Sequence, residues 1–207
     1  MPLFEKHPSL LLGIWKIEET VPELMDLIGK SDDYSCFLKE CKSESRKKEW
    51  LATRILLKHL LERDEKIAYY SDGAPYVPNS PDLSISISHT KGYAAVYCSR
   101  NKTVGVDIEY RGERVQRIKK RFLSEGELAG INLEHETEHL LIHWCAKETL
   151  FKLIRQEEVD FRKQLHVISF AYKAEGEIQV FETRTSCRES FTLFFKVTPE
   201  FVLTFNR

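Results

Sequence analysis

Residues 83–109, LSISISHTKGYAAVYCSRNKTVGVDIE, contain two runs in which apolar and polar side chains alternate, separated by turn-forming segments. A period of two residues is typical of a strand that buries one face, so strands are predicted over residues 83–88, 93–98 and 104–109. The connections between these strands are short. Short connections favour pairing as an antiparallel meander.

Helical patterns precede and follow this segment. Residues 32–61 are rich in lysine, glutamate and leucine, with the clearest helical spacing over residues 44–61. Residues 113–122 and 137–154 have similar patterns. Further strands are predicted over residues 11–17, 165–172, 178–182, 191–197 and 202–205.

Helices followed by hairpins therefore occur twice along the chain. This order predicts an α+β fold of two similar halves, a pseudo-dimer in which each half packs a short antiparallel sheet on helices. The N-terminal half is expected to cover residues 1–102. The C-terminal half, residues 103–207, is expected to carry a metal site. A ligand cleft is expected between the two halves.

The composition narrows the class of protein. Of 207 residues, 42% are hydrophobic and 30% are charged, with a net charge of −1, which argues against nucleic-acid binding because that would need a basic field. The apolar run at residues 10–15 is far shorter than the ~20 residues of a membrane span and does not follow a cationic leader. Five scattered cysteines form no Cys-x-x-Cys pair. We therefore expect a cytoplasmic protein with reduced thiols. We also expect a monomer, because the two predicted halves form a pseudo-dimer within one chain.

Two acidic residues, Asp107 and Glu109, stand two positions apart in a predicted strand and so share one face. Val106 and Ile108 are expected to point the other way, into the core, and Gly105 to leave room for a ligand. An ordinary solvated face explains this pattern equally well. A magnesium ion would relieve the repulsion between the two carboxylates, because Mg²⁺ binds one or two carboxylates together with phosphate oxygens.

The predicted helix over residues 140–154 is apolar on nearly every side, which is typical of a buried helix, yet it carries Lys147, Glu148 and Lys152. An exposed ion pair between Glu148 and Lys152, one turn apart, is the plainer interpretation. Burying these charges would cost several kcal/mol per ion unless each has further partners. The pattern therefore favours a ligand site.

Ser88 and His89 end a predicted strand and can bind a phosphate, although a lone histidine is more often structural. Ser88 lacks the glycine-rich elbow of a serine hydrolase. Acids that suit Mg²⁺ and cations that suit phosphate oxygens are thus both present, as metal-assisted phosphoryl chemistry requires. The acids are Asp107, Glu109 and Glu148, and the cations are Lys152, His89 and Arg54.

The strand VGVDIE at residues 104–109 and the segment WCAKETLFK at residues 144–152 resemble the paired signature of the 4′-phosphopantetheinyl transferase superfamily. Upstream, WLATR at residues 50–54, GAPY at residues 73–76 and SISH at residues 86–89 are also similar to this family. The chain length and the two halves resemble its larger, surfactin-synthetase-activating type.

The resemblance implies transfer of 4′-phosphopantetheine from coenzyme A to a serine of an apo acyl or peptidyl carrier protein, with Mg²⁺ as cofactor. The products would be the holo carrier and adenosine 3′,5′-bisphosphate. Asp107, Glu109 and Glu148 would hold the metal, and Lys152 would contact the phosphate under attack or the leaving oxygen. Glu148 would also be the general base, directly or through a metal-bound water.

For coenzyme A, the resemblance implies that Arg54 and His89 bind the 3′-phosphate, with Ser88 close by. The loop that contains Gly73 and Pro75 would lie against the adenine.

The sequence departs from the family pattern at three positions. Ala74 replaces a frequent lysine, so a contact to coenzyme A would have to come from Lys91 or Arg46. Cys145 and Thr149 also differ from the usual residues, but they leave the proposed metal acids and Lys152 intact.

Two other functions stay open at this point. The first is a non-catalytic relative that binds a carrier protein or a nucleotide. The second is another Mg²⁺-dependent nucleotide enzyme, which the absence of a glycine-rich phosphate loop disfavours. Residues 114–121 contain a basic run, which either docks an acidic carrier or is simply solvated. Its members are Arg114, Arg117, Lys119, Lys120 and Arg121.

Overall fold

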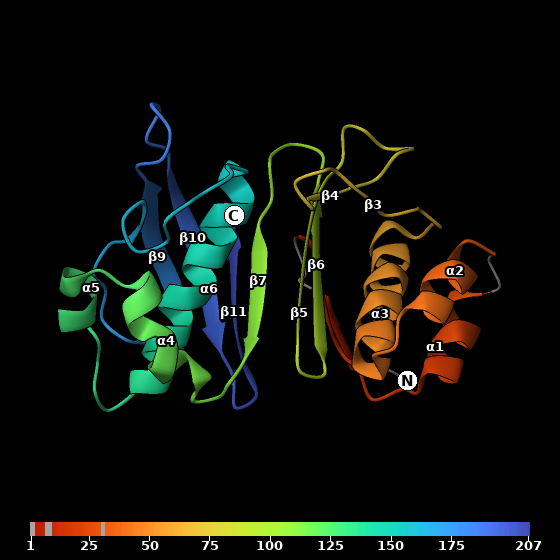
Figure 1. Ribbon diagram of the computed structural model, residues 1–207, viewed down its shortest axis with the longest axis horizontal. Helices are drawn as coiled ribbons and strands as arrows, with labels where there is room; N and C mark the ends of the chain where they lie inside the picture. The colour runs from red at the N-terminus through yellow and green to blue at the C-terminus, as the bar shows by residue number, and fades with distance from the viewer. Residues whose placement is uncertain (1–2, 7–9, 30–31) are drawn as a thin grey trace. The chain divides into compact units, whose positions relative to one another are not determined.

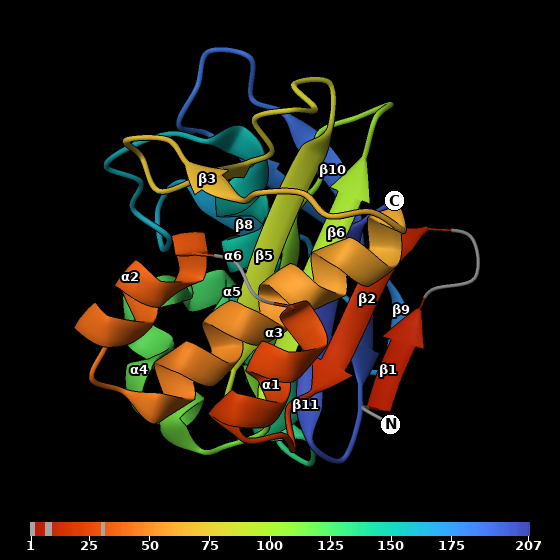
Figure 2. The ribbon, with the colours of Figure 1, turned by 90° about the vertical axis from the view of Figure 1, so that its right-hand side faces the viewer.

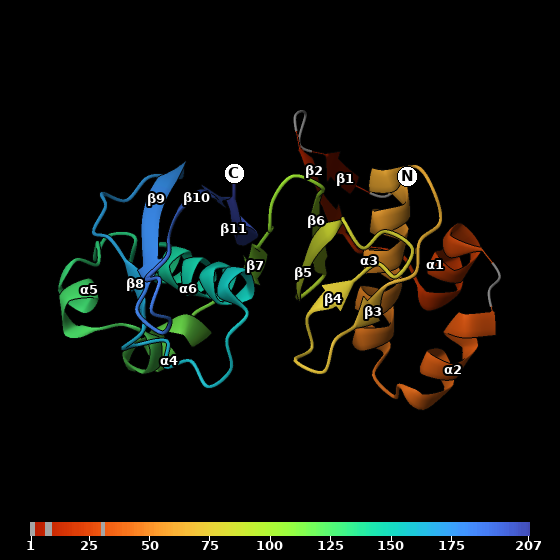
Figure 3. The ribbon, with the colours of Figure 1, turned by 90° about the horizontal axis from the view of Figure 1, so that it is seen from above.

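The computed structural model describes residues 3–6, 10–29 and 32–207. The chain divides into two compact units, Met1–Lys102 and Thr103–Arg207. In each unit one long helix lies across one face of an antiparallel sheet (Figure 1, Figure 3). The predicted α+β class is confirmed, whereas the pseudo-dimer and its cleft stay predictions.

The sheet of the N-terminal unit has four strands in the order β1-β2-β6-β5. Their bounds are Leu3–Lys6 for β1, Leu11–Lys16 for β2, Ser84–Thr90 for β5 and Tyr93–Ser99 for β6. A separate two-stranded ribbon is formed by β3 (Ala68–Tyr69) and β4 (Pro75–Tyr76), and the helices are α1 (Val21–Ile28), α2 (Asp32–Glu40) and α3 (Glu44–Leu61).

Helix α3 begins at the predicted residue because the Ser43 side chain accepts a hydrogen bond from the Arg46 backbone N–H, which satisfies a donor at the helix start. Helix α3 lies against β2 and β6 of the sheet (Figure 2). Its buried residues, among them Leu51 and Ile55, belong to the same hydrophobic cluster as Trp15 of β2. The single helical stretch predicted from residue 32 is wrong, since residues 41–43 separate α2 from α3.

The sheet of the C-terminal unit has five strands in the order β7-β11-β10-β9-β8, all antiparallel. The strand bounds are Val106–Tyr110 for β7, Leu165–Val167 for β8, Glu175–Glu182 for β9, Ser190–Val197 for β10 and Phe201–Asn206 for β11. The helices are α4 (Arg114–Phe122), α5 (Glu125–Ala129) and α6 (Glu136–Ile154).

The predicted three-stranded meander is wrong. Strands β5 and β6 form the expected hairpin, but β7 pairs with β11, nearly a hundred positions further along the chain. The reason is that both edges of β6 are occupied, one by β5 and the other by β2. Strand β7 therefore opens the sheet of the second unit.

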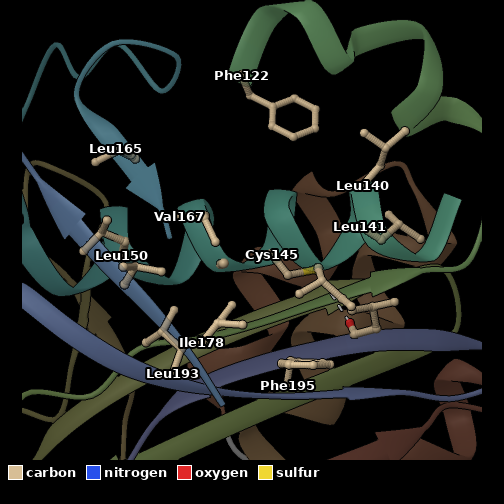
Figure 4. Close-up of a cluster of buried hydrophobic side chains, with 14 of the residues drawn as sticks. Phe122, Leu140, Leu141, Cys145, Leu150, Leu165, Val167, Ile178, Leu193 and Phe195 are labelled. Atoms are coloured by element: carbon tan, nitrogen blue, oxygen red, sulfur yellow. Dashed lines mark hydrogen bonds between the residues drawn. The ribbon is translucent and has the colours of Figure 1, made fainter. Parts of the chain in front are cut away.

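Helix α6 forms the centre of the C-terminal core. Side chains of α6 such as Leu150 and Cys145 lie between residues of the sheet, including Leu193 and Phe195, and residues of the surrounding segments, including Phe122 (Figure 4). Cys145 and Leu150 have no exposed surface. The prediction that this helix is buried on most sides is confirmed, and its polar residues are thereby held in fixed positions.

No helix in the described ranges has the length and apolar character needed to cross a membrane.

Candidate active site

The acidic residues of β7 face helix α6. Asp107 lies opposite Thr204 of β11, and the Thr204 hydroxyl is 2.6 Å from the Thr149 hydroxyl of α6. Residues directly opposite each other in a sheet share a face, so Asp107 points to the helix side. Val106 and Ile108 are also buried, but on the opposite face. The prediction that Val106 and Ile108 are buried on the face opposite the acids is therefore confirmed, and the face of the acids also packs against α6.

Gly105 permits a close approach of the helix rather than a ligand. A Cβ atom at this position would lie 2.8 Å from the Thr149 carbonyl oxygen and 2.9 Å from Cγ of Leu153. Any side chain here would thus force α6 away from β7. The space that was predicted for a ligand is filled by α6, and the close packing brings the helix onto the two acids.

Asp107 forms an ion pair with Lys152 of α6. The Lys152 Nζ atom donates to Asp107 Oδ1 at 2.7 Å and to the Val106 carbonyl oxygen at 2.9 Å. The Asp107 side chain is 6% exposed and that of Lys152 is 26% exposed. The pair is therefore enclosed at the carboxylate and open to solvent at the ammonium.

Glu109 contacts a different residue of the same helix. The indole N–H of Trp144 donates to Glu109 Oε1 at 3.0 Å. Both side chains are half-buried. The two acids of β7 are thus each held by one side chain of α6.

Glu148 lies on α6 between these two contacts. Burial, together with the negative charges of Asp107 and Glu109, raises the pKa of Glu148 to about 7 against the lowering effect of Lys152. The three predicted acids therefore act on one another electrostatically across β7 and α6. Within the described ranges, no three His, Cys, Asp or Glu side chains are arranged as a formed metal site.

Lys147, next to Glu148, has a structural environment. Its Nζ atom donates to the Phe122 carbonyl at 2.6 Å, to Glu127 Oε2 at 2.8 Å and to the Phe161 carbonyl at 3.0 Å, and its side chain is fully buried. Burial acts to raise the pKa of Glu127, but Lys147 and nearby N–H donors lower it overall. All three ammonium donors are used within the fold.

The two departures from the family pattern on α6 are accommodated in the core. The Cys145 thiol lies 3.7 Å from the Val202 carbonyl oxygen and is fully buried, and burial raises its pKa. The Thr149 hydroxyl bonds that of Thr204. Both residues therefore pack α6 on β11.

The N-terminal unit brings His89 together with α3. Arg46 donates to His89 Nε2, and His89 Nδ1 lies 3.2 Å from Glu49 Oε2. Because arginine can only donate, Nε2 is the acceptor and Nδ1 carries the proton that faces Glu49. Glu49 was not predicted, because no pattern in the sequence sets it apart from the other charged residues of α3.

Arg54 lies on the same side of α3 as Arg46, two turns further on. Its guanidinium carbon is 3.4 Å from the ring centroid of Trp50, and its Nη1 atom donates to the Trp50 carbonyl at 3.1 Å. Burial lowers the pKa of Arg54, an effect that Tyr69 opposes and that Arg46 reinforces. Arg46 therefore lies near both Arg54 and His89, and the Glu49 carboxylate offsets part of its charge.

The other residues predicted to bind coenzyme A are more separate. Ser88 and His89 are consecutive residues of β5, so their side chains point to opposite faces. Gly73 has a positive φ of 81°, a conformation that favours glycine, and its N–H donates to the Tyr70 carbonyl in the turn before Pro75. Of this group, His89 contacts α3 through Arg46 and Glu49.

Helix α4 carries the basic run on its exposed side. Val115 and Phe122 are buried, which fixes the orientation of the helix. Lys119 forms an ion pair with Glu136 at 2.5 Å. The other cations of the run, Arg114, Arg117, Lys120 and Arg121, are exposed.

Comparison with known proteins matches the unit that contains β7 and α6. The family model described as the 4′-phosphopantetheinyl transferase superfamily matches residues 103–205. A 4′-phosphopantetheinyl transferase of Bacillus subtilis is 30% identical over 111 residues, which cover 52% of this chain and 48% of the relative. AcpT, a 4′-phosphopantetheinyl transferase of Escherichia coli (strain K12), is 32% identical over 113 residues, or 52% of this chain and 57% of the relative.

A third relative, the 4′-phosphopantetheinyl transferase Sfp of Bacillus subtilis (strain 168), is 26% identical over 111 residues and supports the larger type. The chain spans about half the length of the curated relatives that it matches. The matched region contains all four predicted residues of the β7–α6 site. The chain belongs to the 4′-phosphopantetheinyl transferase superfamily, and residues 103–205 are the part that carries this membership.

Proposed function

We propose that this protein transfers the 4′-phosphopantetheine group from coenzyme A to a serine of an apo acyl or peptidyl carrier protein. The observation that carries the proposal is the grouping of Asp107, Glu109, Glu148 and Lys152 on β7 and α6, within the region that matches the superfamily. Three acids and one ammonium are the groups that phosphoryl transfer asks of a protein.

The residues present fit a magnesium ion. Hard cations prefer carboxylate oxygens, and after burial the charges of Asp107 and Glu109 also raise the pKa of Glu148, which supports a common environment for the three acids. The Glu109 carboxylate, which accepts from Trp144 through Oε1, is one of these hard donors. Asp107, Glu109 and Glu148 would hold the ion, and when bound it would offset the charge of the pyrophosphate oxygens.

Lys152 orients and stabilises the phosphoryl group. Two of its three N–H bonds hold it to Asp107 and to the Val106 carbonyl, so the third can donate to an oxygen of the phosphate under attack or of the leaving group. Because its position is fixed by α6 and β7 together, this donor is in place before the substrate arrives.

Glu148 takes the proton of the attacking serine, directly or through a water molecule. The serine oxygen then forms a bond to the phosphorus that bears pantetheine, and the bond from that phosphorus to the bridging oxygen breaks. The products are the holo carrier and adenosine 3′,5′-bisphosphate.

For coenzyme A, we propose that the positive group of the N-terminal unit, Arg46, Arg54 and His89, binds the 3′-phosphate. Arginine suits phosphate because its planar guanidinium offers several donors. Arg46 replaces the charge that Ala74 lacks, as one of the two predicted substitutes. Gly73 and Pro75 would form the turn beside the adenine. We also propose that exposed cations of α4 meet an acidic surface of the carrier.

Mass spectrometry tests the transfer. The protein is incubated with coenzyme A, Mg²⁺ and an apo carrier, and the carrier should gain the mass of one phosphopantetheine. Glu148→Gln should abolish the gain, whereas the matched variant Glu157→Gln, at an exposed position just after α6, should retain it. Binding of coenzyme A and carrier without any gain would instead support the non-catalytic alternative.

The 3′-phosphate assignment has its own test. Arg46→Ala should raise KM for coenzyme A about tenfold, as expected from losing one charged hydrogen bond, but should leave KM for 3′-dephospho-coenzyme A unchanged. An equal increase with both substrates would remove Arg46 from the phosphate site.

A further inference from the structure

Arg54 of α3 is an almost buried cation that has no acidic partner. Only 7% of the residue is exposed, and burial lowers the pKa of its guanidinium. Among the residues that the structure describes, none of the groups that act on Arg54 is a carboxylate. By contrast, the buried ammonium of Lys147 is paired with Glu127. Because an enclosed, unpaired charge is costly, Arg54 is in the state expected of a cation that awaits an external anion.

Trp50, one helical turn earlier on α3, holds the guanidinium in place of an acid. The guanidinium carbon of Arg54 lies 3.4 Å from the centre of the Trp50 ring, and Arg54 Nη1 donates to the Trp50 carbonyl oxygen at 3.1 Å. The face of an indole ring attracts a cation, yet the ring has no net charge. Trp50 therefore fixes the position of the arginine without cancelling its charge, as a carboxylate would.

Helix α2 supports the same indole from its other face. The Phe37 ring is stacked on the Trp50 ring with 4.4 Å between the centroids and 13° between the planes. Tyr34 meets Trp50 edge-on at 5.4 Å. Because Phe37 and the Arg54 guanidinium both lie so close to the ring centre, they must occupy opposite faces of the indole. The ring is thus enclosed on both faces and has little freedom to turn away from Arg54.

The β3–β4 ribbon also reaches Arg54. A hydrogen bond and a charge interaction with the Tyr69 side chain of β3 oppose the lowering of the pKa of Arg54 by burial. In the described part of the chain, no nitrogen of Arg54 is both buried and unbonded. The nitrogens that are not bonded to Trp50 or Tyr69 therefore reach solvent, where they can donate to a phosphate oxygen.

We infer that Trp50 is a positioning residue that holds the Arg54 guanidinium, with its charge uncancelled, for the 3′-phosphate of coenzyme A, and that Phe37 supports it. This inference rests on the proposed function, because it assigns a task at the proposed coenzyme A site. Arg46 is held differently, since its Nη1 atom lies 3.5 Å from Glu49 Oε2 and part of its charge is already offset. Helix α2 thereby contributes to the recognition of coenzyme A through a ring stack.

The test compares ligands that differ by one phosphate. Binding of adenosine 3′,5′-bisphosphate and of adenosine 5′-monophosphate is measured by calorimetry, and KM is measured for coenzyme A and for 3′-dephospho-coenzyme A. Trp50→Leu removes the ring that holds Arg54. Phe194→Leu is the matched control, because the Phe194 ring of the C-terminal unit also contacts an arginine, Arg207 at 4.3 Å, and a second ring, Phe205 at 5.8 Å.

Trp50→Leu should weaken binding of adenosine 3′,5′-bisphosphate about fivefold and raise KM for coenzyme A by a similar factor, as expected from losing one cation–π contact. The values for adenosine 5′-monophosphate and 3′-dephospho-coenzyme A should stay at the wild-type level. Phe194→Leu should change none of these values. Phe37→Leu, which keeps the indole but loosens its support, should act in the same direction by less. In a protein that carries Arg54→Met, adding Trp50→Leu should cause no further loss.

Equal losses with both nucleotides in Trp50→Leu would overturn the inference, because the effect would then be structural. So would wild-type affinity for adenosine 3′,5′-bisphosphate in that variant, or the same loss in Phe194→Leu. If Trp50→Leu does not fold, Phe37→Leu decides the point, and its unchanged preference for the bisphosphate would count against the inference. A wild-type protein that prefers the bisphosphate but never modifies a carrier would instead overturn the proposed transfer alone.

Discussion

Lys147 and Lys152 lie five residues apart on α6, and each bonds a carboxylate; Lys147 also bonds two main-chain carbonyls and Lys152 bonds one. Lys147 bonds Glu127 at 2.8 Å and Lys152 bonds Asp107 at 2.7 Å. The two lysines differ in their exposure and in the number of N–H donors that stay unused. Lys147 is fully buried and spends all three donors inside the fold, whereas Lys152 is 26% exposed and spends two. One helix can thus carry two similar ion pairs, one enclosed in the core and one open to solvent.

The difference shows that the partners of a buried charge, rather than burial alone, indicate function. A lysine whose donors are all used cannot take a substrate oxygen without breaking an internal bond. A lysine with a remaining donor at a partly open position can. Substituting methionine at each position separates the two cases, because methionine keeps much of the side-chain length and removes the charge.

Lys147→Met should give the largest effect of these substitutions, and it should do so by lowering the free energy of unfolding. It leaves Glu127 and two main-chain carbonyls without their buried partner, which typically costs about 3–5 kcal/mol. Chemical denaturation measures this loss as a lower unfolding midpoint. A loss below about 1 kcal/mol would show that water replaces the ammonium, and that the frame around Lys147 is not closed.

Lys152→Met should act mainly on catalysis. Removing one electrostatic donor to a developing charge lowers kcat by about 10²–10³. Its unfolding free energy should fall less than that of Lys147→Met, since solvent reaches the Lys152 end of the pair. Transfer kinetics and denaturation of the same preparations give both values. The assignment fails if kcat holds and only the KM for coenzyme A rises.

The pH dependence of stability tests the closed side of α6 further. His143 lies one turn before Lys147, and burial lowers its pKa to about 3 from an ordinary 6.5, with Glu127 raising it and His139 and Lys147 lowering it. The folded protein therefore keeps His143 neutral where the unfolded chain binds a proton. Stability is fully present above pH 6.5 and is lost as pH falls towards 3, by about 2 kcal/mol at pH 5.

Denaturation at pH 7 and pH 5 measures this loss, with His143→Leu as the comparison. The variant should show a smaller difference between the two pH values because it lacks the titrating group. Glu127 stays ionised over this range, since its pKa is lowered from 4.5. An unchanged difference in the variant would mean that another group, such as His139, is responsible.

The sequence was sufficient for the elements with strong local signals. Helix α3 begins at Ser43 as its cap and ends as predicted, and α6 differs by one residue at its start, because apolar spacing and capping are properties of neighbouring residues. The two acids and Lys152 were recognisable from their pattern. Their spacing placed the acids on one face of β7, as the structure has them.

What was missed depends on residues far apart in the chain. Pairing of β7 with β11 could not be predicted from strand spacing, and alternation did not reveal which face meets α6 because both faces are buried. The contact of Trp144 with Glu109 spans 35 positions, and that of Lys147 with Phe122 spans 25. Such contacts follow from the packing of α6, which local patterns do not specify.

The smallest predicted effect concerns Thr149, which lies between Lys147 and Lys152 on α6. The hydroxyls of Thr149 and Thr204 are 2.6 Å apart and both residues are fully buried, so Thr149→Val leaves the partner hydroxyl unpaired at a cost of about 1–2 kcal/mol. The double variant Thr149→Val with Thr204→Val should cost less than the single one, because it removes both polar groups from the core. Denaturation of the two single variants and the double variant completes the cycle. Additive losses of unfolding free energy would show that the two hydroxyls contribute independently. The tightly packed region around Lys147 would then not extend as far as Asp107.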